Sequence, residues 1–497
     1  MSDEATEPPK PTRHLRNWLS LAGGVLAVSA FFAFLFLFAI DLFAHNGNPY
    51  MGILAYVVAP GFLFLGLGMI VLGVWFQRRH EKKLGTAVAI PSVLHVDLKR
   101  PGDRRKLVIF ILCSVVFLLC TAIGSYQSYH VSESVTFCGQ ACHVPMKPEF
   151  TAYQNGAHAR VDCVACHVGH GAEAFVKAKM NGVHQLVGVM TGDYAHPIKT
   201  PIRNLRPARE TCEECHWPQK FSGNLDRTYQ HFLADETNTP FAVRLSLKVG
   251  GSDPAHGTVG GIHWHVSQNN KIEYLATDDR RQIIPWVRVT NPQGVVTEYR
   301  SPKFTNDISQ FEIRTMDCID CHNRPAHRFR SPNDAVDLAM SLGIIDRNLP
   351  WAKSNIVAVL TQTYDTEPHA LENIATVLRG KYSAAPKLDA LIREAQTIYA
   401  KNFFPEMKAD WRAYPENIGH KDWPGCFRCH DDSHKAVHDA KKKIPASDCA
   451  SCHTILAQGA GADMEKLNPK GGTFIHIDAE YGNFDCSSCH TGAFPKE

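Results

Sequence analysis

The sequence predicts an N-terminal anchor of three membrane-spanning helices, followed by an extramembrane domain of mostly helix and coil with a small antiparallel β insertion. Three observations support this fold class. Three long apolar segments precede residue 130, fourteen of the 16 cysteines form pairs that a histidine follows at once, and residues 240–315 alternate between apolar and polar. A chain of 497 residues is long enough for several domains, and its net charge of +3 gives no reason to expect nucleic acid as a partner.

The three apolar segments run over about residues 18–43, 51–76 and 107–129. Each is close to the roughly 20 apolar residues that a helical crossing of a bilayer needs. Basic residues precede the first segment, as in a signal peptide, but its apolar part is too long and no polar stretch follows a cleavage site. The first segment is therefore predicted to be an uncleaved anchor.

The charges of the loops predict the orientation in the membrane. Residues 77–106 carry nine Lys or Arg, whereas residues 44–50 carry none. Since basic loops remain on the cytoplasmic side, the N-terminus and the 77–106 loop are predicted to be cytoplasmic. Three crossings then place everything after residue 130 on the periplasmic side of a bacterial inner membrane.

Six cysteine pairs fit the pattern C-x-x-C-H. This spacing lets two thiols add to the two vinyl groups of a haem while the adjoining histidine binds the iron. Zinc sites combine two pairs per metal without a histidine after each, and a disulfide across two residues would be strained and would leave the histidines unexplained. The six motifs are Cys163/Cys166/His167, Cys212/Cys215/His216, Cys318/Cys321/His322, Cys426/Cys429/His430, Cys449/Cys452/His453 and Cys486/Cys489/His490.

A seventh motif, Cys138/Cys142/His143, has three residues between its cysteines and directly follows the third apolar segment. Beside six regular motifs we interpret it as a further haem site. The chain is then a multihaem cytochrome c with seven covalent c haems, whose porphyrins fill much of the interior. Haem c is attached outside the cytoplasm in bacteria, in agreement with the predicted topology. Cys113 and Cys120 lie within the third apolar segment and are interpreted as small packing residues.

Haem iron with two histidine ligands is closed to substrate and suited to electron transfer, so histidines outside the motifs are candidate sixth ligands. Fifteen such histidines follow residue 129. The favoured candidates lie close to a motif or in ordered-looking surroundings: His158, His231, His263, His265, His327, His434 and His476. The others rank lower: His130, His170, His184, His196, His256, His369, His420 and His438.

The periplasmic part divides into four predicted segments. Residues 131–225 carry the first three motifs, residues 226–330 hold the β insertion with the fourth, residues 331–425 form a helical linker, and residues 426–497 carry the last three. The strands are predicted from "FAVRLSLKV", "KIEYLATD", "IIPWVRVTN" and "GVVTEYRS". In the linker, capping residues and apolar side chains three or four apart predict helices. The last segment is predicted to be coil, with a loop over residues 457–472.

A membrane span, a haem motif with a trailing methionine, and then "HARVDCVACHVGHG", "FVKAKMNG" and "RETCEECHWPQKF" together resemble the NapC/NirT family of membrane-anchored quinol dehydrogenases. The resemblance covers about residues 107–225. Seven motifs with three spans resemble, more narrowly, the seven-haem inner-membrane cytochromes of metal-reducing bacteria. The resemblance implies a first haem at the membrane surface beside a quinol pocket, with later haems passing electrons outward.

The resemblance also implies site residues. In relatives the methionine after the first motif can replace the motif histidine as proximal ligand, which points to Met146. A lysine about ten residues after the second motif lies at the quinol pocket of relatives, which points to Lys177 or Lys179. The acidic residue that relatives carry just beyond this lysine is not evident, since His184 or Gln185 stands there.

These features predict an inner-membrane cytochrome that oxidises menaquinol and passes electrons to periplasmic c-type cytochromes in anaerobic or extracellular respiration. The alternative is a passive membrane-anchored conduit that a partner subunit feeds, in which the lysines only contact lipid headgroups. A catalytic multihaem enzyme is disfavoured, because no C-x-x-C-K motif is present. Quinol oxidation by the isolated protein distinguishes the first two.

Overall fold

A computed structural model of the chain describes residues 17–43, 58–84, 98–105, 107–109, 111–112, 126, 130–169, 171–202, 206–217, 221, 223–250, 260–267, 269–446, 448–477 and 485–493. The chain divides into two compact units. The anchor unit falls within residues 1–137 and 168–184, and the motif unit comprises residues 138–167 and 185–497. All seven cysteine–histidine motifs therefore belong to the motif unit.

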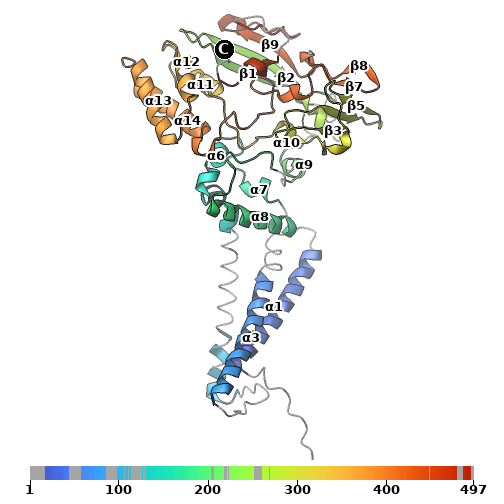
Figure 1. The fold of residues 1–497 in the computed structure, drawn as a ribbon, viewed down its shortest axis with the longest axis vertical. Helices are drawn as coiled ribbons and strands as arrows, with labels where there is room; N and C mark the ends of the chain where they lie inside the picture. Colours follow the sequence, from blue (N-terminus) through green and yellow to red (C-terminus); the bar gives the residue numbers. More distant parts are fainter. Residues whose placement is uncertain are drawn as a thin grey trace, which may run out of the picture. The chain divides into compact units, whose positions relative to one another are not determined.

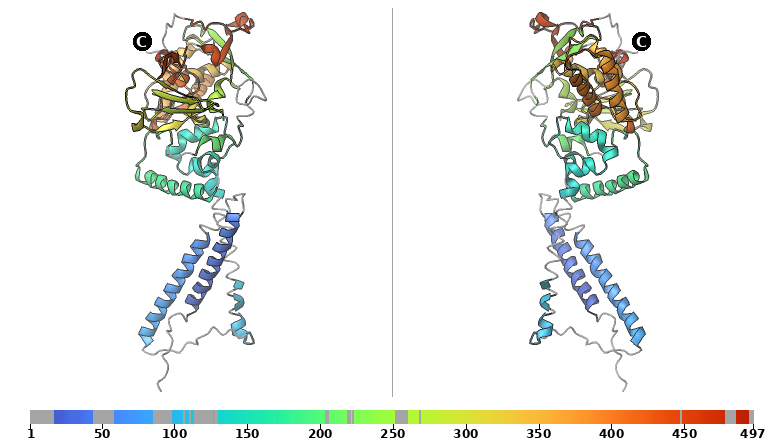
Figure 2. Two further views of the ribbon diagram at one scale, coloured as in Figure 1. Left: turned by 90° about the vertical axis from the view of Figure 1, so that its right-hand side faces the viewer. Right: turned by 90° about the vertical axis from the view of Figure 1, so that its left-hand side faces the viewer.

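Two long apolar helices, α1 (Trp18–Phe43) and α3 (Ala59–Leu84), run side by side in the anchor unit (Figures 1 and 2). Both are long and apolar enough to cross a membrane. Small residues let them approach closely, because a Cβ atom at Gly23 would lie 2.6 Å from the carbonyl oxygen of Gly66. The helix α3 continues past the predicted end at residue 76, since good helix formers follow. Most of the third predicted span lies outside the described residues.

Each cysteine pair of the motif unit lies on or beside a short helical turn, which places residues three apart on the same side. The α-helices that carry or flank motif cysteines are α5 (Val135–Gln140), α6 (His143–Gln154), α7 (Cys163–His167), α9 (Ala208–Cys212), α10 (Cys318–Cys321) and α15 (Cys486–Cys489). The 3-10 turns are η4 (Ile262–Val266), η5 (Ile308–Gln310), η6 (Pro405–Met407), η7 (Gly425–Arg428), η8 (Cys449–Ser451) and η9 (Gly461–Met464). The helix α8 (Ala172–Thr191) begins in the anchor unit and ends in the motif unit.

Two antiparallel sheets lie in the motif unit. The three-stranded sheet has the order β1-β2-β9, with β1 Leu225–Phe232, β2 Pro240–Leu247 and β9 His453–Gly459. The six-stranded sheet has the order β6-β3-β4-β5-β7-β8, with β3 Lys271–Leu275, β4 Trp286–Thr290, β5 Val296–Arg300, β6 Ile313–Thr315, β7 Lys435–Ala436 and β8 Asp439–Lys443.

The sequence prediction of one small sheet and a C-terminal coil is wrong in its extent. Both sheets receive strands from the last seventy residues, because β9 pairs with β2 and β7 pairs with β5. Residues 457–459, predicted to open a loop, belong to β9, where Ile455 and Ala457 are buried. The segment that forms β9 is short, and its pairing partner β2 lies about two hundred residues earlier in the chain, so the sequence pattern near the sixth motif does not reveal the strand.

Four helices form the largest apolar core of the described residues: α11 (Pro332–Ser341), α12 (Ala352–Leu360), α13 (Glu367–Lys381) and α14 (Leu388–Asn402). Ser331 and Thr366 cap α11 and α13 by accepting hydrogen bonds from backbone N–H groups. The sequence prediction of an Asp or Asn cap for the first of these helices is wrong, because Ser331 lies directly before Pro332 at the helix start. Val336, Ile356 and Leu378 are fully buried between these helices. This core lies at one side of the motif unit and the six-stranded sheet at the other (Figure 1). The helical segment is therefore a packed scaffold and not an extended connection.

Candidate haem-binding centres

Six motif histidines each lie beside one histidine from another part of the motif unit. A metal–imidazole bond is about 2 Å long, and the ring centre lies about 1 Å beyond the nitrogen, so two rings on opposite sides of one iron have centres about 6 Å apart. The observed separations fit this value. The pairs are His167 with His327 (6.2 Å), His216 with His158 (6.1 Å), His322 with His263 (6.3 Å), His430 with His265 (5.8 Å), His453 with His420 (6.3 Å) and His490 with His476 (5.9 Å).

The non-motif rings of four pairs are oriented by backbone carbonyl groups. His158 Nδ1 donates to the oxygen of Pro325 at 3.1 Å, and His327 Nδ1 donates to that of Glu149 at 2.9 Å. His263 and His265 bond in the same way to carbonyl oxygens. Because a carbonyl only accepts, the proton is on Nδ1 and the lone pair that a metal requires is on Nε2. These rings therefore fit the role of axial haem ligands.

Neighbouring motifs meet through their thiols, starting from the first motif. The Cys163 thiol donates to the Cys138 sulfur, which raises the pKa of Cys163. Burial raises the pKa of Cys166, and the nearby Cys212 adds to this effect. The Cys318 thiol in turn donates to Cys212, which raises the pKa of Cys318. The first four motifs thus follow one another in space in the order of the sequence.

The remaining motifs continue the same series. Burial raises the pKa of Cys321 to about 11, with a further increase from the neighbouring Cys426. Burial also raises the pKa of Cys452, to which Cys426 contributes as well. The pKa of Cys486 is raised by burial and by nearby acidic groups that include Cys449. The fourth to seventh motifs are therefore also successive neighbours, and the seven form one series.

The motif cysteines differ in their exposure to solvent. Ten of the fourteen are half-buried, and four are exposed: Cys215, Cys426, Cys449 and Cys489. Cys215 is the second cysteine of the third motif. It lies just beyond the end of α9, where its N–H donates to the oxygen of Cys212 at 3.2 Å, so the turn carries one cysteine half-buried and the next at the surface.

Cys215 also belongs to the series of neighbouring thiols. The pKa of Cys166 is raised first by burial, then by Cys212 and then by Cys215, so Cys215 lies close to the second motif. Its exposure places the third motif at the surface of the motif unit, while its role in haem attachment stays a prediction.

His434 is a favoured candidate from the sequence, but its surroundings do not suit a haem ligand. The side chain is buried, with Nδ1 2.8 Å from Asp431 Oδ1 and Nε2 2.8 Å from the oxygen of Ile284. Although burial opposes it, hydrogen bonds from His434 and Ser433 lower the pKa of Asp431 to about 2. Both ring nitrogens are therefore engaged in hydrogen bonds within the protein, and neither is left for iron.

His420, which ranks low from the sequence, lies beside His453 instead. His420 precedes the fifth motif in the sequence but lies beside the histidine of the sixth. The distance along the chain from a motif therefore does not predict which motif histidine a ring pairs with. His231, another favoured candidate, forms none of the six ring pairs. Its Nδ1 lies 3.2 Å from Asp337 Oδ2, and Asp337 also binds Lys353 Nζ at 2.7 Å. His231 thus contributes to a buried polar contact between β1 and α11.

The first motif is packed differently from the others. A Cβ atom on Gly139 would overlap the Phe150 ring at 2.1 Å, so the wider cysteine spacing accommodates a glycine on which an aromatic ring lies. Met146 is half-buried on α6, where its N–H donates to the oxygen of Cys142 at 3.1 Å. The side chain of His143 is outside the described part. Met146 is thus placed one helical turn after the second cysteine.

The two candidate quinol-site lysines lie on α8 in the anchor unit but have different surroundings. Lys177 is exposed. Lys179 Nζ lies 2.5 Å from Glu133 Oε1, donates to the oxygen of Ser132 at 3.1 Å, and lies over the Phe175 ring. The family resemblance predicts an acidic residue just after the lysine, whereas the acidic partner in the structure, Glu133, lies 46 residues before Lys179. No local spacing rule could have found Glu133.

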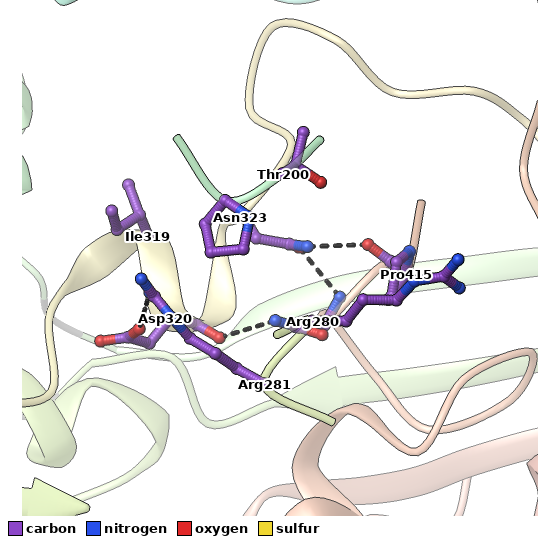
Figure 3. Close-up of a pocket in the computed structure, with 9 residues that line it drawn as sticks. Thr200, Arg280, Arg281, Ile319, Asp320, Asn323 and Pro415 are labelled. Carbon is purple, nitrogen blue, oxygen red and sulfur yellow. Dashed lines mark hydrogen bonds and ion pairs between the residues drawn. The ribbon is translucent and has the colours of Figure 1, made fainter. Parts of the chain in front are cut away.

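A polar pocket borders the fourth motif (Figure 3). Asp320, between the two motif cysteines, accepts hydrogen bonds from Tyr274 Oη at 2.6 Å and Arg281 Nη1 at 3.2 Å. On its other side, Asn323 Nδ2 donates to the oxygen of Pro415 at 2.7 Å. Burial and the nearby Asp320 raise the pKa of Tyr274. The polar groups of this pocket are used by the protein itself, so the pocket holds the motif in place.

The cysteine–histidine motifs, the paired histidines and the two apolar helices define a membrane-anchored c-type cytochrome, a protein that transfers electrons. Residues 100–206 match the NapC/NirT cytochrome c family, N-terminal region. The chain is 39% identical over 501 residues to the "Cytochrome c-type protein ImcH" of Geobacter sulfurreducens, with 97% of each chain covered. The chain therefore belongs to the NapC/NirT family of cytochromes. No solved structure matches it.

Proposed function

We propose that this chain is an inner-membrane heptahaem cytochrome that oxidises menaquinol and passes the electrons to periplasmic c-type cytochromes. The observation that carries the proposal is the single series of motifs, which starts at Cys138, directly after the anchor unit, and ends near the C-terminus. We propose three spans with a cytoplasmic N-terminus, a topology that would put this series in the periplasm. Membership of a family of membrane-anchored cytochromes supports the same reading.

The fourteen motif cysteines would hold the haems covalently, and the seven motif histidines and their ring partners would bind the irons. When bound, each haem c supplies a carrier for one electron. The protein contributes the order of the sites, the orientation of the axial rings and the buried surroundings. Histidine on both sides of the metal leaves no open position, which favours electron transfer over catalysis at the second to seventh sites.

Quinol oxidation requires that two electrons and two protons leave the substrate, so a polar group must accept protons at the membrane edge. Glu133 and Lys179 provide such a group. The ammonium of Lys179 pairs with the Glu133 carboxylate, since Nζ lies 2.5 Å from Oε1. The carboxylate would accept a proton from a quinol hydroxyl and release it to water, while Lys179 donates a hydrogen bond that positions the quinol oxygen. Exposed Lys177 is the weaker candidate for this role.

Reduction of the purified, detergent-solubilised protein by a menaquinol analogue tests the proposed function. We expect the haem absorption bands to change to the reduced form within the mixing experiment, with dithionite defining full reduction. A protein that dithionite reduces but the quinol does not would contradict quinol oxidation and favour the conduit that a partner subunit feeds.

Substitution of Met146 tests the ligand of the first haem. If the thioether binds the iron, Met146→Ala removes the near-infrared methionine–iron absorption band of the oxidised protein, and the other six haems keep their spectra. Met464→Ala, on the 3-10 turn after β9, is a matched control that leaves the band in place. An unchanged band in Met146→Ala would show that Met146 does not bind the iron and is a packing residue.

A further inference from the structure

We propose that one turn of 3-10 helix, Ile262–Val266, supplies the distal ligands of two haems: His263 to the fourth motif and His265 to the fifth. The inference rests on the haem-attachment part of the proposed function and not on quinol oxidation. Both histidines lie outside the residues that match the family's N-terminal region. The sequence favours both as candidate sixth ligands but assigns neither to a particular haem.

The geometry separates the two rings. A 3-10 helix turns by about 120° per residue, so side chains two positions apart point to different sides of the turn. His263 is nearly parallel to His322, with an interplanar angle of 8° at 6.3 Å. His265 is nearly perpendicular to His430, with an angle of 73° at 5.8 Å. One short element thus faces two motif histidines that lie more than a hundred residues apart.

Contacts on every side fix this turn. Gly261 precedes it with a φ of 84°, and a Cβ atom there would lie 2.3 Å from the oxygen of Lys248, so only glycine fits. Asn270 Nδ2 donates to the oxygen of Trp264 at 3.1 Å, and Arg209, on the helix of the third motif, donates to the oxygen of Val266 at 3.3 Å. The turn is therefore fixed by contacts with other parts of the motif unit.

The fourth and fifth motifs are also joined directly. Arg428, between the two cysteines of the fifth motif, donates to the oxygen of Asp320 in the fourth at 2.7 Å and to that of Arg281 at 2.9 Å. Cys429 is half-buried and lies near Cys321. The turn and this arginine would hold the two haems as one rigid pair at the middle of the series. Electron transfer between the two halves of the series would then depend on it.

Electron paramagnetic resonance of the oxidised, full-length protein tests the assignment without quinol activity. Low-spin haem with nearly parallel axial rings gives an ordinary rhombic signal, whereas nearly perpendicular rings give a signal of large maximal g. We expect His263→Ala to convert one rhombic component of the spectrum to high spin. We expect His265→Ala to remove one large-g component. In both variants pyridine haemochrome analysis should still count as many haems as in the parent protein.

His438→Ala, an exposed histidine after β7, is the control and should leave every component in place. Where an alanine variant fails to accumulate, His263→Met and His265→Met keep a sixth ligand, and each should add a near-infrared methionine–iron band. Variants at both positions that keep all low-spin components, add no such band, or lose the same component would overturn the proposal. A parent protein with normal signals but no quinol activity would contradict quinol oxidation alone.

Discussion

Replacing Glu133 with Gln is expected to slow menaquinol-dependent haem reduction by about 10²-fold or more, the usual contribution of a general base. The amide keeps a hydrogen bond to Lys179 but cannot accept a proton. The rate is measured by stopped-flow absorption with a menaquinol analogue over a range of pH. Because the amide cannot accept a proton at any pH, the variant should be slower than the parent protein over the whole range.

The adjacent lysines provide the control for this prediction. Lys179→Met removes the ammonium that pairs with the Glu133 carboxylate and would position the quinol oxygen, so we expect a similar loss of rate. Lys177→Met removes an exposed charge on the same helix and should change the rate by less than about threefold. All variants should remain fully reducible by dithionite. Equal losses in Lys177→Met and Lys179→Met, or an unaffected Glu133→Gln variant, would exclude this ion pair as the proton-accepting group.

Two histidine substitutions near the fifth motif are expected to have opposite effects. His420→Ala should convert one low-spin haem to high spin, because it removes the ring that lies 6.3 Å from His453, while the stability changes little. His434→Ala should leave every haem signal unchanged but lower the free energy of unfolding by about 3 kcal/mol. The reason is that the Asp431 carboxylate and the Ile284 carbonyl lose the buried ring to which both are hydrogen-bonded.

Both variants are measured by electron paramagnetic resonance and by guanidinium denaturation of the holoprotein. Each serves as the control of the other, since one is assigned to a haem and the other to packing. A loss of low-spin signal in His434→Ala would show that His434 is a haem ligand, as the sequence favours. It would require the buried ring to give up the bond to Ile284 that the structure shows.

The sequence by itself determined the local features of this protein. A haem-attachment motif is a single helical turn, so two cysteines and a histidine at fixed spacing are enough to identify it. The same holds for α1, whose apolar length shows within one segment of the chain, and for α14, whose apolar side chains recur every three or four residues. Each of these signals is complete within about twenty neighbouring residues.

Only the tertiary structure decided which distant groups meet. It placed His420 beside His453 and turned His434 toward Asp431, although both histidines lie close to the same motif. It completed two sheets with strands from the C-terminal segment, and it brought Glu133 to Lys179. The physical reason is that packing selects an axial ligand, a strand partner or an ion pair from residues far apart in the sequence. Local residue type and spacing do not specify which of these distant residues will be in contact.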